Sequence, residues 1–553
     1  MELTRREAIG TLAVVTAATP AAGAVPSIDR ALIQRHDQTV ERYLAQQITD
    51  PASPGCGNFP NQFGLYYTGT ASGIIDAFTS ALLLPASKFH NSGVVMERIR
   101  LAIRYLLAAQ NAEGNVELVE TNFNSPPDTG FVTQVVAATA KNARTYGAPE
   151  IFTLLEPFLR KAAPALERGG VHTPNHRWVM SAAMAQLHEL FPSPGLVRRI
   201  DQWLAEGIDI DADGQFTERS ALVYNSITDR ALVLLALKLR RPELLEPVRR
   251  NLDAMLYLLH PGYEVVSEIS RRQDANQRGT MASYWFPLAH LARIDQNGRY
   301  ATLANHFASQ AASISDLLAF PELAQPGPVE QPVPDDYEKR FDSVGLTRIR
   351  HGLTSATLLD QRSRAFSLHR GAAVIHAVRF ASAFFGKAQF IPGVWRKDGA
   401  GYVATQSIEG PYFQPFDPPR KIGTEDWEET RRLRKQSEVC RLTQSATVTE
   451  TRNGFRLRIR SEGTRGVPVA VEINLREGGI LEGCSPAPQV LDGWILDRGE
   501  ATYRLGGNAV RFGPGVAPHR YTQIRGAEPK LPGPSVYLTG FTPFDHTIGF
   551  EWS

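Results

Sequence analysis

The sequence predicts a multidomain α+β protein, with an N-terminal (α/α) toroid followed by a C-terminal antiparallel β-sandwich. From residue 28 to residue 320, apolar residues recur at spacings of three and four, which is the period of amphipathic helices. From residue 341 to residue 553, apolar and polar residues alternate instead, which is the period of half-buried strands. Residues 321–340 are rich in proline and lack a core pattern, so they are predicted to be a linker.

Residues 1–24 have the three-part layout of an export signal: a basic opening, a short apolar run and an exit of small residues. The paired Arg5 and Arg6 resemble the twin-arginine pattern of proteins exported in folded form. We therefore expect export to the periplasm or out of the cell. The alternative is an ordinary amphipathic N-terminal helix. No later run of about twenty apolar residues predicts a membrane span.

The helical part consists of periodic stretches separated at fairly regular intervals by loops with Gly, Pro, Asn and Asp. The clearest stretches are VVMERIRLAIRYLLAAQ, IFTLLEPFLRKAAPALER, GLVRRIDQWLAEGID and LLEPVRRNLDAMLYLLH. Helical hairpins that follow one another in this way pack as a solenoid or close into a toroid.

The strand part is predicted from the alternating stretches SATVTET, FRLRIR, VPVAVEINL and ATYRL. Asn453-Gly454 stands between the first two stretches, and this dipeptide is a strong signal for a tight hairpin. Several such strands in succession favour an antiparallel sandwich.

Composition excludes several classes of function. Lys and Arg total 59 against 57 Asp and Glu, so the net charge of +2 predicts neither nucleic acid nor an anionic membrane as a partner. An acidic ligand would need a local cluster of arginines. The three cysteines, Cys56, Cys440 and Cys484, form no CxxC pair and no complete disulfide framework.

No metal or cofactor is expected from motif spacing. His172 and His176 are four residues apart, but Pro174 interrupts a continuous helix between them. The acidic run that begins at Asp209 starts like a calcium loop, yet Ser220 stands where a bidentate Glu is needed. The sequence also has no Gly-x-Ser-x-Gly elbow, Walker A loop or His-Glu-x-x-His pair.

Asn175 and His176 are the first candidates for chemistry, because Pro174 favours the first turn of a helix that runs through WVMSAAMAQLHELF. The positive end of a helix disfavours imidazolium and attracts a carboxylate, so His176 would remain a neutral base beside an anion site. Capping and packing would explain the same doublet. Tyr224 lies at another helix start, where tyrosine serves either in packing or as a proton donor.

The helical half, the β-rich half, the Asn-His doublet and the later Tyr together resemble the heparinase II/III-type polysaccharide lyases. The resemblance implies a cleft that binds uronic acid polysaccharides, and β-elimination that leaves a 4,5-unsaturated uronate. It implies that Asn175 neutralises the uronate carboxylate, His176 takes the C5 proton and Tyr224 protonates the leaving oxygen. Where the geometry is syn, Tyr224 would act as both base and acid.

The resemblance also implies a catalytic histidine from the sandwich, for which the sequence offers His351 and His369, with His351 preferred. Predicted substrate contacts come from a proline-fixed loop, from a polar stretch between helices and from arginines near the proposed chemistry. They are Asn124, Asp128, Arg177, Arg219, Arg272 and Gln273. Capping turns and solvated loops are the alternatives for these residues.

Two other functions remain compatible with the sequence. A glycoside hydrolase on an (α/α) toroid needs two carboxylates across a cleft, with Asp128, Glu218 and Asp229 as possible sources. A glycan-binding protein would use the same cleft without turnover.

Overall fold

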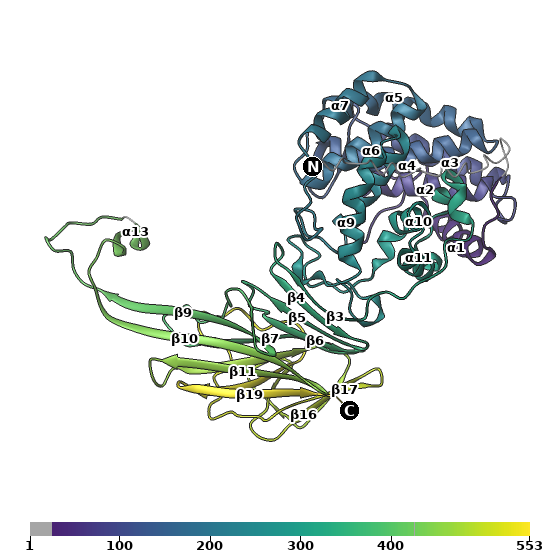
Figure 1. Ribbon diagram of the computed structural model, residues 1–553. Helices are drawn as coiled ribbons and strands as arrows, with labels where there is room; N and C mark the ends of the chain where they lie inside the picture. The colour runs from purple at the N-terminus through teal and green to yellow at the C-terminus, as the bar shows by residue number, and fades with distance from the viewer. Residues whose placement is uncertain (1–24, 425, 553) are drawn as a thin grey trace, which may run out of the picture.

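The computed structural model describes residues 25–424 and 426–552, so the predicted export signal at residues 1–24 lies outside the described residues. A round helical body stands against two long, twisted sheets (Figure 1). The expected fold class, a toroid followed by a sandwich, is confirmed. No helix in the described chain is long and apolar enough to cross a membrane. The three cysteines are free.

The toroid is built from helices that pack in sequence against their neighbours. They are α1 (Arg30–Gln46), α2 (Thr68–Leu83), α3 (Gly93–Ala109), α4 (Pro126–Thr145), α5 (Pro149–Arg168), α6 (Pro174–Leu190), α7 (Pro194–Ala205), α8 (Tyr224–Leu239), α9 (Leu245–Met255), α10 (Trp285–Ile294), α11 (Gly298–Ala311) and α12 (Ile314–Ala319). A small hairpin, β1 (Val116–Leu118) and β2 (Asn122–Ser125), precedes α4.

The inner helices of the toroid are buried on more of their faces than the outer helices. Helix α6 is 17 residues long and buries residues on all of its faces, from Asn175 to Leu190, whereas α7 buries only Leu196 and Ile200. Small residues such as Ala182, Ala183 and Ala185 let neighbouring helices approach α6 closely. Polar groups at the start of an inner helix are therefore removed from water, which matters for the chemistry described below.

The sandwich consists of two sheets whose strands run antiparallel except for the parallel pair β15 and β18. The nine-stranded sheet has the order β14 (Ser485–Pro486), β15 (Gly493–Ile495), β18 (Ser535–Phe541), β12 (Pro468–Leu475), β7 (Ala373–Ser382), β6 (Phe366–Arg370), β5 (Thr354–Leu359), β4 (Leu346–His351) and β3 (Asp336–Phe341). The eight-stranded sheet has the order β13 (Ile480–Glu482), β16 (Ala501–Leu505), β17 (Asn508–Gly513), β19 (Phe544–Glu551), β11 (Gly454–Gly463), β10 (Gln436–Thr451), β9 (Gly401–Phe413) and β8 (Arg396–Asp398).

Because apolar and polar side chains alternate along the strands, each sheet has an apolar face, and these two faces pack together as one core. Phe366 of the nine-stranded sheet meets Phe455 and Phe550 of the other sheet, with ring centroids 6.0 and 5.9 Å apart. The Asn453-Gly454 signal is confirmed, because β10 and β11 form an antiparallel hairpin that closes with Thr451 opposite Gly454. Beyond the body of the sandwich, β9 and β10 continue as an arm that carries the short helix α13 (Trp427–Arg431) (Figure 1).

The segment predicted as a linker is held against the toroid. Gln331 donates its backbone N–H to the carbonyl of Gly298 at 3.1 Å, and its own carbonyl accepts from the hydroxyl of Thr302 at 2.7 Å. Strand β3 begins at Asp336, within that segment. The chain therefore passes from α12 to the sandwich along the surface of α11, without a long free connection.

A buried arginine joins the two domains. Arg348 on β4 is fully buried, and its guanidinium donates to the carbonyls of Leu259 at 3.1 Å and Tyr257 at 3.4 Å in the toroid. It also donates to the hydroxyls of Ser355, at 2.7 Å, and Thr357 on the neighbouring strand. These bonds fix the part of the toroid that follows α9 on the face of the nine-stranded sheet.

Replacing Arg348 with methionine should lower the free energy of unfolding, because methionine fills similar space but leaves buried acceptors without a donor. Each such group costs roughly 1–3 kcal/mol. Urea unfolding followed by fluorescence measures the change. Arg456→Met, at an exposed position of β11, is the matched control and should have little effect. Equal effects of the two substitutions would contradict the role given to Arg348.

Candidate active site

Asn175 lies in the first turn of α6, as Pro174 predicts, and it is almost completely buried. Its amide nitrogen donates to Oε2 of Glu218 at 2.7 Å and to the hydroxyl of Thr173 at 3.2 Å. Its amide oxygen is also buried, yet no described residue donates to it. A buried polar atom without a partner is rare in proteins and marks a place where a ligand would satisfy it.

His176 lies beside Asn175 with 8% of its surface exposed. Its Nδ1 is buried and has no partner within the described chain. Burial, followed by the charge of His172, lowers the pKa of His176 to about 4. The ring of His172 meets it edge to face at 4.7 Å, and Phe131 meets it in the same manner at 6.1 Å. At neutral pH His176 is therefore an uncharged imidazole able to accept a proton.

Tyr224 begins α8, and its hydroxyl accepts a hydrogen bond from Nε2 of Gln273 at 2.5 Å. The guanidinium of Arg272 lies over the tyrosine ring, 4.8 Å from its centroid. Both partners belong to the loop between η3 (Ser267–Ile269) and η4 (Met281–Tyr284). The polar stretch predicted from sequence therefore lies directly against the predicted acid.

Glu218 connects these groups into one network. Its carboxylate accepts from Asn175 through Oε2, while its Oε1 lies 3.2 Å from Nη1 of Arg272. It is 6% exposed. The sequence suggested Glu218 only as one carboxylate of a hydrolase; in the structure it holds Asn175 and Arg272 in place. The network runs from the start of α6 through Glu218 to Arg272, Tyr224 and Gln273.

Two arginines predicted to bind substrate are instead occupied by structural contacts. The guanidinium of Arg177 binds the carboxylates of Glu206 at 3.1 Å and Asp209 at 2.7 Å. Arg219 donates to the backbone carbonyls of Ser343 and Val344 in the sandwich. Both guanidinium groups are therefore engaged in contacts within the protein, and their assignment to substrate binding stays a prediction that these contacts do not support.

The two residues predicted to contact substrate from the β1–β2 hairpin and the start of α4, Asn124 and Asp128, are also hydrogen-bonded to near neighbours. The amide oxygen of Asn124 accepts from Asn111 at 2.7 Å and Asn115 at 2.9 Å, and its nitrogen donates to Glu113. These bonds give a substrate contact by Asn124 no support, and that contact stays a prediction. Asp128 accepts from Ser125 and Asn122 at the start of α4, but its charge reaches His176 and acts to raise the pKa of that residue.

His351 does not reach the toroid. It is the last residue of β4, pairs in register with Asp336 on β3, and its ring lies between the carboxylates of Asp336 and Glu450. These contacts give the choice of His351 as a catalytic residue no support, and it stays a prediction. His369 on β6 is the histidine of the sandwich that meets the toroid, where its ring stacks on His260 with centroids 3.5 Å apart.

Asp229, proposed as a possible hydrolase carboxylate, is completely buried in α8, and neither of its oxygens has a partner in the described chain. Burial raises the pKa of Asp229 well above the usual value of an aspartate, because the charged form is poorly solvated there. A buried group of this kind cannot face a second carboxylate across a solvent-filled cleft, which removes one of the three sources that hydrolysis would use.

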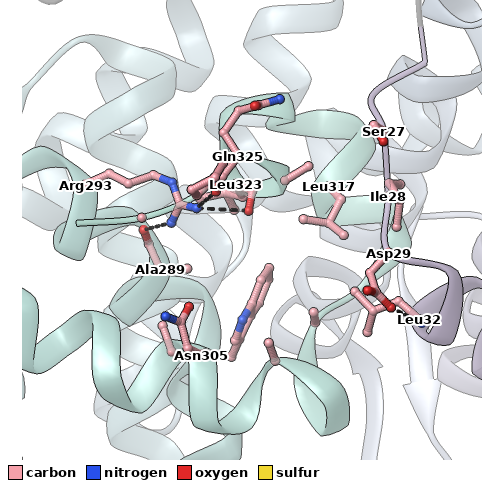
Figure 2. A pocket seen from close by; sticks show the side chains of 17 residues that line it. Ser27, Ile28, Asp29, Leu32, Ala289, Arg293, Asn305, Leu317, Leu323 and Gln325 are labelled. Carbon is pink, nitrogen blue, oxygen red and sulfur yellow. Dashed lines mark hydrogen bonds between the residues drawn. The ribbon is translucent and has the colours of Figure 1, made fainter. Parts of the chain in front are cut away.

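Two larger hollows lie outside this network. A cavity of about 300 Å³ lies between α10, α11 and the segment that leads into α1; Figure 2 shows Arg293 there with its donors directed to backbone carbonyls. It contains none of the candidate residues. A second hollow of about 580 Å³ follows the domain boundary and is lined by Asp213, Arg250, Arg299 and Lys339.

No protein-family model matches the sequence, and no curated protein matches it. Among solved structures, the chondroitin AC lyase of Streptomyces coelicolor A3 in complex with chondroitin sulphate has a TM-score of 0.55 at 12% identity, covering 94% of this chain and 79% of that chain. The Paenibacillus xanthan lyase has a TM-score of 0.56 at 10% identity, covering 94% of this chain and 57% of that chain. The chain therefore has the toroid-and-sandwich fold of these polysaccharide lyases.

Proposed function

We propose that the protein is a polysaccharide lyase that cleaves a uronic acid glycan by β-elimination. One observation carries this proposal: a buried, neutral His176 without a hydrogen-bond partner lies beside Asn175, in a network that also contains Arg272 and Tyr224. These are the three kinds of group that the reaction needs: a base, an acid, and a site that stabilises negative charge.

The first requirement is to make the C5 proton acidic. That proton lies next to a carboxylate, so its loss builds a second negative charge on the same group. Asn175 and Arg272 would share this charge through N–H donors. The amide hydrogen that Asn175 gives to Thr173 is the more weakly bound of its two, at 3.2 Å against 2.7 Å to Glu218, so a substrate carboxylate would replace Thr173.

The proton transfers then follow from the remaining residues. His176 takes the proton from C5, the electron pair of that bond forms the C4–C5 double bond, and the bond from C4 to the glycosidic oxygen breaks. The phenol of Tyr224 gives its proton to that oxygen. Gln273 donates to the phenolic oxygen at 2.5 Å, so its amide stabilises the phenolate that this transfer leaves behind.

The wide hollow at the domain boundary suits a polymeric substrate. It borders the same loop as Glu218, and the basic groups of Arg250, Arg299 and Lys339 outnumber the nearby carboxylates of Asp213 and Asp253. Sugars beyond the reacting one would lie along it if they carry negative charge. The chondroitin sulphate bound by one structural neighbour and the xanthan named for the other are therefore the first substrates to test.

Absorbance of the unsaturated uronate should rise when the purified protein meets one member of a panel of chondroitin sulphate, heparan sulfate, xanthan and alginate. His176→Ala and Tyr224→Phe should each lower kcat/KM by roughly 10²- to 10⁴-fold, because each removes one proton transfer. His306→Ala and Tyr412→Phe, at exposed positions, are the matched controls and should keep full activity. New reducing ends without the absorbance would show hydrolysis and overturn the proposal.

The pH dependence of kcat/KM tests the base separately. A pKa of about 4 for His176 keeps the base unprotonated from neutral pH down to about pH 5, so activity should stay level there. Below about pH 4 it should fall roughly tenfold per pH unit, as His176 takes up its proton. His172→Gln removes the second cause of the lowered pKa, so the acid limb should move to higher pH.

Samples returned to pH 7 after each incubation control for unfolding in this experiment. An acid limb near the ordinary histidine value of about 6.5 in both proteins would rule out the buried His176 as the base.

We also propose that residues 1–24 direct export, which suits an enzyme whose polymeric substrate lies outside the cytoplasm. Changing both Arg5 and Arg6 to lysine should leave the protein in the cytoplasmic fraction, because the twin-arginine machinery reads the guanidinium pair. Cell fractionation followed by immunoblotting measures this. An unchanged exported fraction would contradict the twin-arginine assignment.

A further inference from the structure

Asp274, in the loop between η3 and η4, is a buried carboxylate that the reaction steps above do not use. Its side chain is only 1% exposed, and its contacts within the described chain are hydrogen bonds rather than ion pairs. Removing a carboxylate from water without a neighbouring cation is costly unless hydrogen bonds to it compensate. The donors that Asp274 binds therefore indicate its role.

The carboxylate of Asp274 joins two segments that are far apart in the sequence. One oxygen accepts from the backbone N–H of Leu222 at 3.2 Å, shortly before Tyr224, and the other accepts from the hydroxyl of Ser270. Gly279, in the same loop, has no room for a side chain, because a Cβ atom there would lie 2.3 Å from Cδ1 of Leu222. The loop therefore lies tightly against the residues that lead into α8.

Both of these segments carry groups of the candidate active site. The hydroxyl oxygen of Ser270 accepts from the backbone N–H of Arg272 at 3.1 Å, so the position of one residue affects the other. Arg272 pairs with Glu218, and the next residue, Gln273, donates to the phenolic oxygen of Tyr224. The buried carboxylate therefore links the backbone on both sides of the contact between amide and phenol.

The start of α8 depends on such contacts from outside the helix. Its N-cap residue, Val223, has no side chain that can cap the helix. The backbone N–H of Tyr224 is bound instead by the hydroxyl of Ser220 at 2.9 Å, and that of Leu222 by Asp274. Proton transfer needs heavy atoms within about 2.6–3.2 Å of each other. A displacement of about 1 Å can lower a rate by roughly 10²-fold, so the anchoring of this turn matters for the reaction.

We propose that Asp274 is a positioning residue for the lyase reaction, which holds Arg272 and Gln273 at the distance from Tyr224 at which the phenol can donate its proton to the leaving oxygen. This inference rests on the proposed function and adds a residue to it. Asp274 itself touches no substrate, because its side chain is buried and both of its oxygens accept hydrogen bonds from within the protein.

Initial rates of absorbance increase over a range of glycan concentrations test this role. Asp274→Ala should lower kcat by roughly 10- to 100-fold, because the phenol and its partners lose their alignment. KM should change by less than about threefold, because Asn175 and the other binding groups remain. Asp274→Asn can accept from Leu222 and donate to Ser270, so it should keep at least about a third of kcat.

A double-mutant cycle separates positioning from general damage to the protein. In a Gln273→Ala background, one of the contacts that Asp274 holds in place is already absent, so Asp274→Ala should cost less in kcat than it costs alone. In a His172→Gln background, beside His176, the cost should equal that in the unaltered protein. Asp398→Ala, at an exposed position of β8, is the matched control and should leave kcat unchanged in each background.

Hydrogen exchange followed by mass spectrometry tests the anchoring without any substrate. Asp274→Ala should speed amide exchange by roughly tenfold in residues 219–224 and 270–277, because the backbone bonds of these two segments then open locally. Residues 454–463 of β11, in the other domain, should exchange as in the unaltered protein. Asp274→Asn should restore most of the protection.

Three results would overturn the proposal: an unchanged kcat in Asp274→Ala, an equal cost of that substitution in the Gln273→Ala and His172→Gln backgrounds, or faster exchange spread evenly over the whole chain. The last result would show general loss of stability instead of local anchoring. If no glycan yields an unsaturated product, the exchange experiment still decides whether Asp274 anchors the loop. Faster exchange confined to the two segments would then support the anchoring, and the missing product would count against the lyase reaction alone.

Discussion

The arrangement of the whole molecule depends on a guanidinium that has no access to water. Arg348 joins the sandwich to the segment after α9 through carbonyls of Tyr257 and Leu259, and the hydroxyls around it belong to the next strand. A buried cation of this kind tolerates few alternative geometries, because each of its donors needs an acceptor in a fixed direction. The docking of the two domains is therefore specified by polar contacts, and it brings Ser355 of β5 and His369 of β6 against His260 of the toroid.

Burial in an inner helix has a second effect, on the chemistry of the candidate active site. Asn175 and His176 begin α6, so the packing that stabilises the toroid also removes water from an amide oxygen and a ring nitrogen. Each unsatisfied atom costs roughly 1–3 kcal/mol. A substrate that supplies partners for both atoms would recover that cost on binding, which favours binding in one orientation.

The sequence was sufficient to predict the fold class and the core of the candidate site. Helical and strand periods are local, and so are Pro174 before Asn175 and the polar stretch with Arg272 and Gln273. The direction in which a side chain points in the folded protein, by contrast, cannot be predicted from the adjacent residues alone. Arg177 adjoins His176 in the sequence, but successive helical residues are about 100° apart around the axis, so its side chain points to Asp209. The neighbours of His351 could not be predicted for a related reason, because strand register sets them and the sequence does not give the register.

The segment from η3 to η4 connects three parts of the molecule over a short length of chain. It carries Glu268 at the domain boundary, Arg272 against Glu218, and Gln273 against Tyr224. An inserted or deleted residue between Glu268 and Gln273 would shift one end relative to the other, whatever its side chain. These contacts therefore constrain the length of the segment more tightly than its exposed side chains, unlike most surface loops.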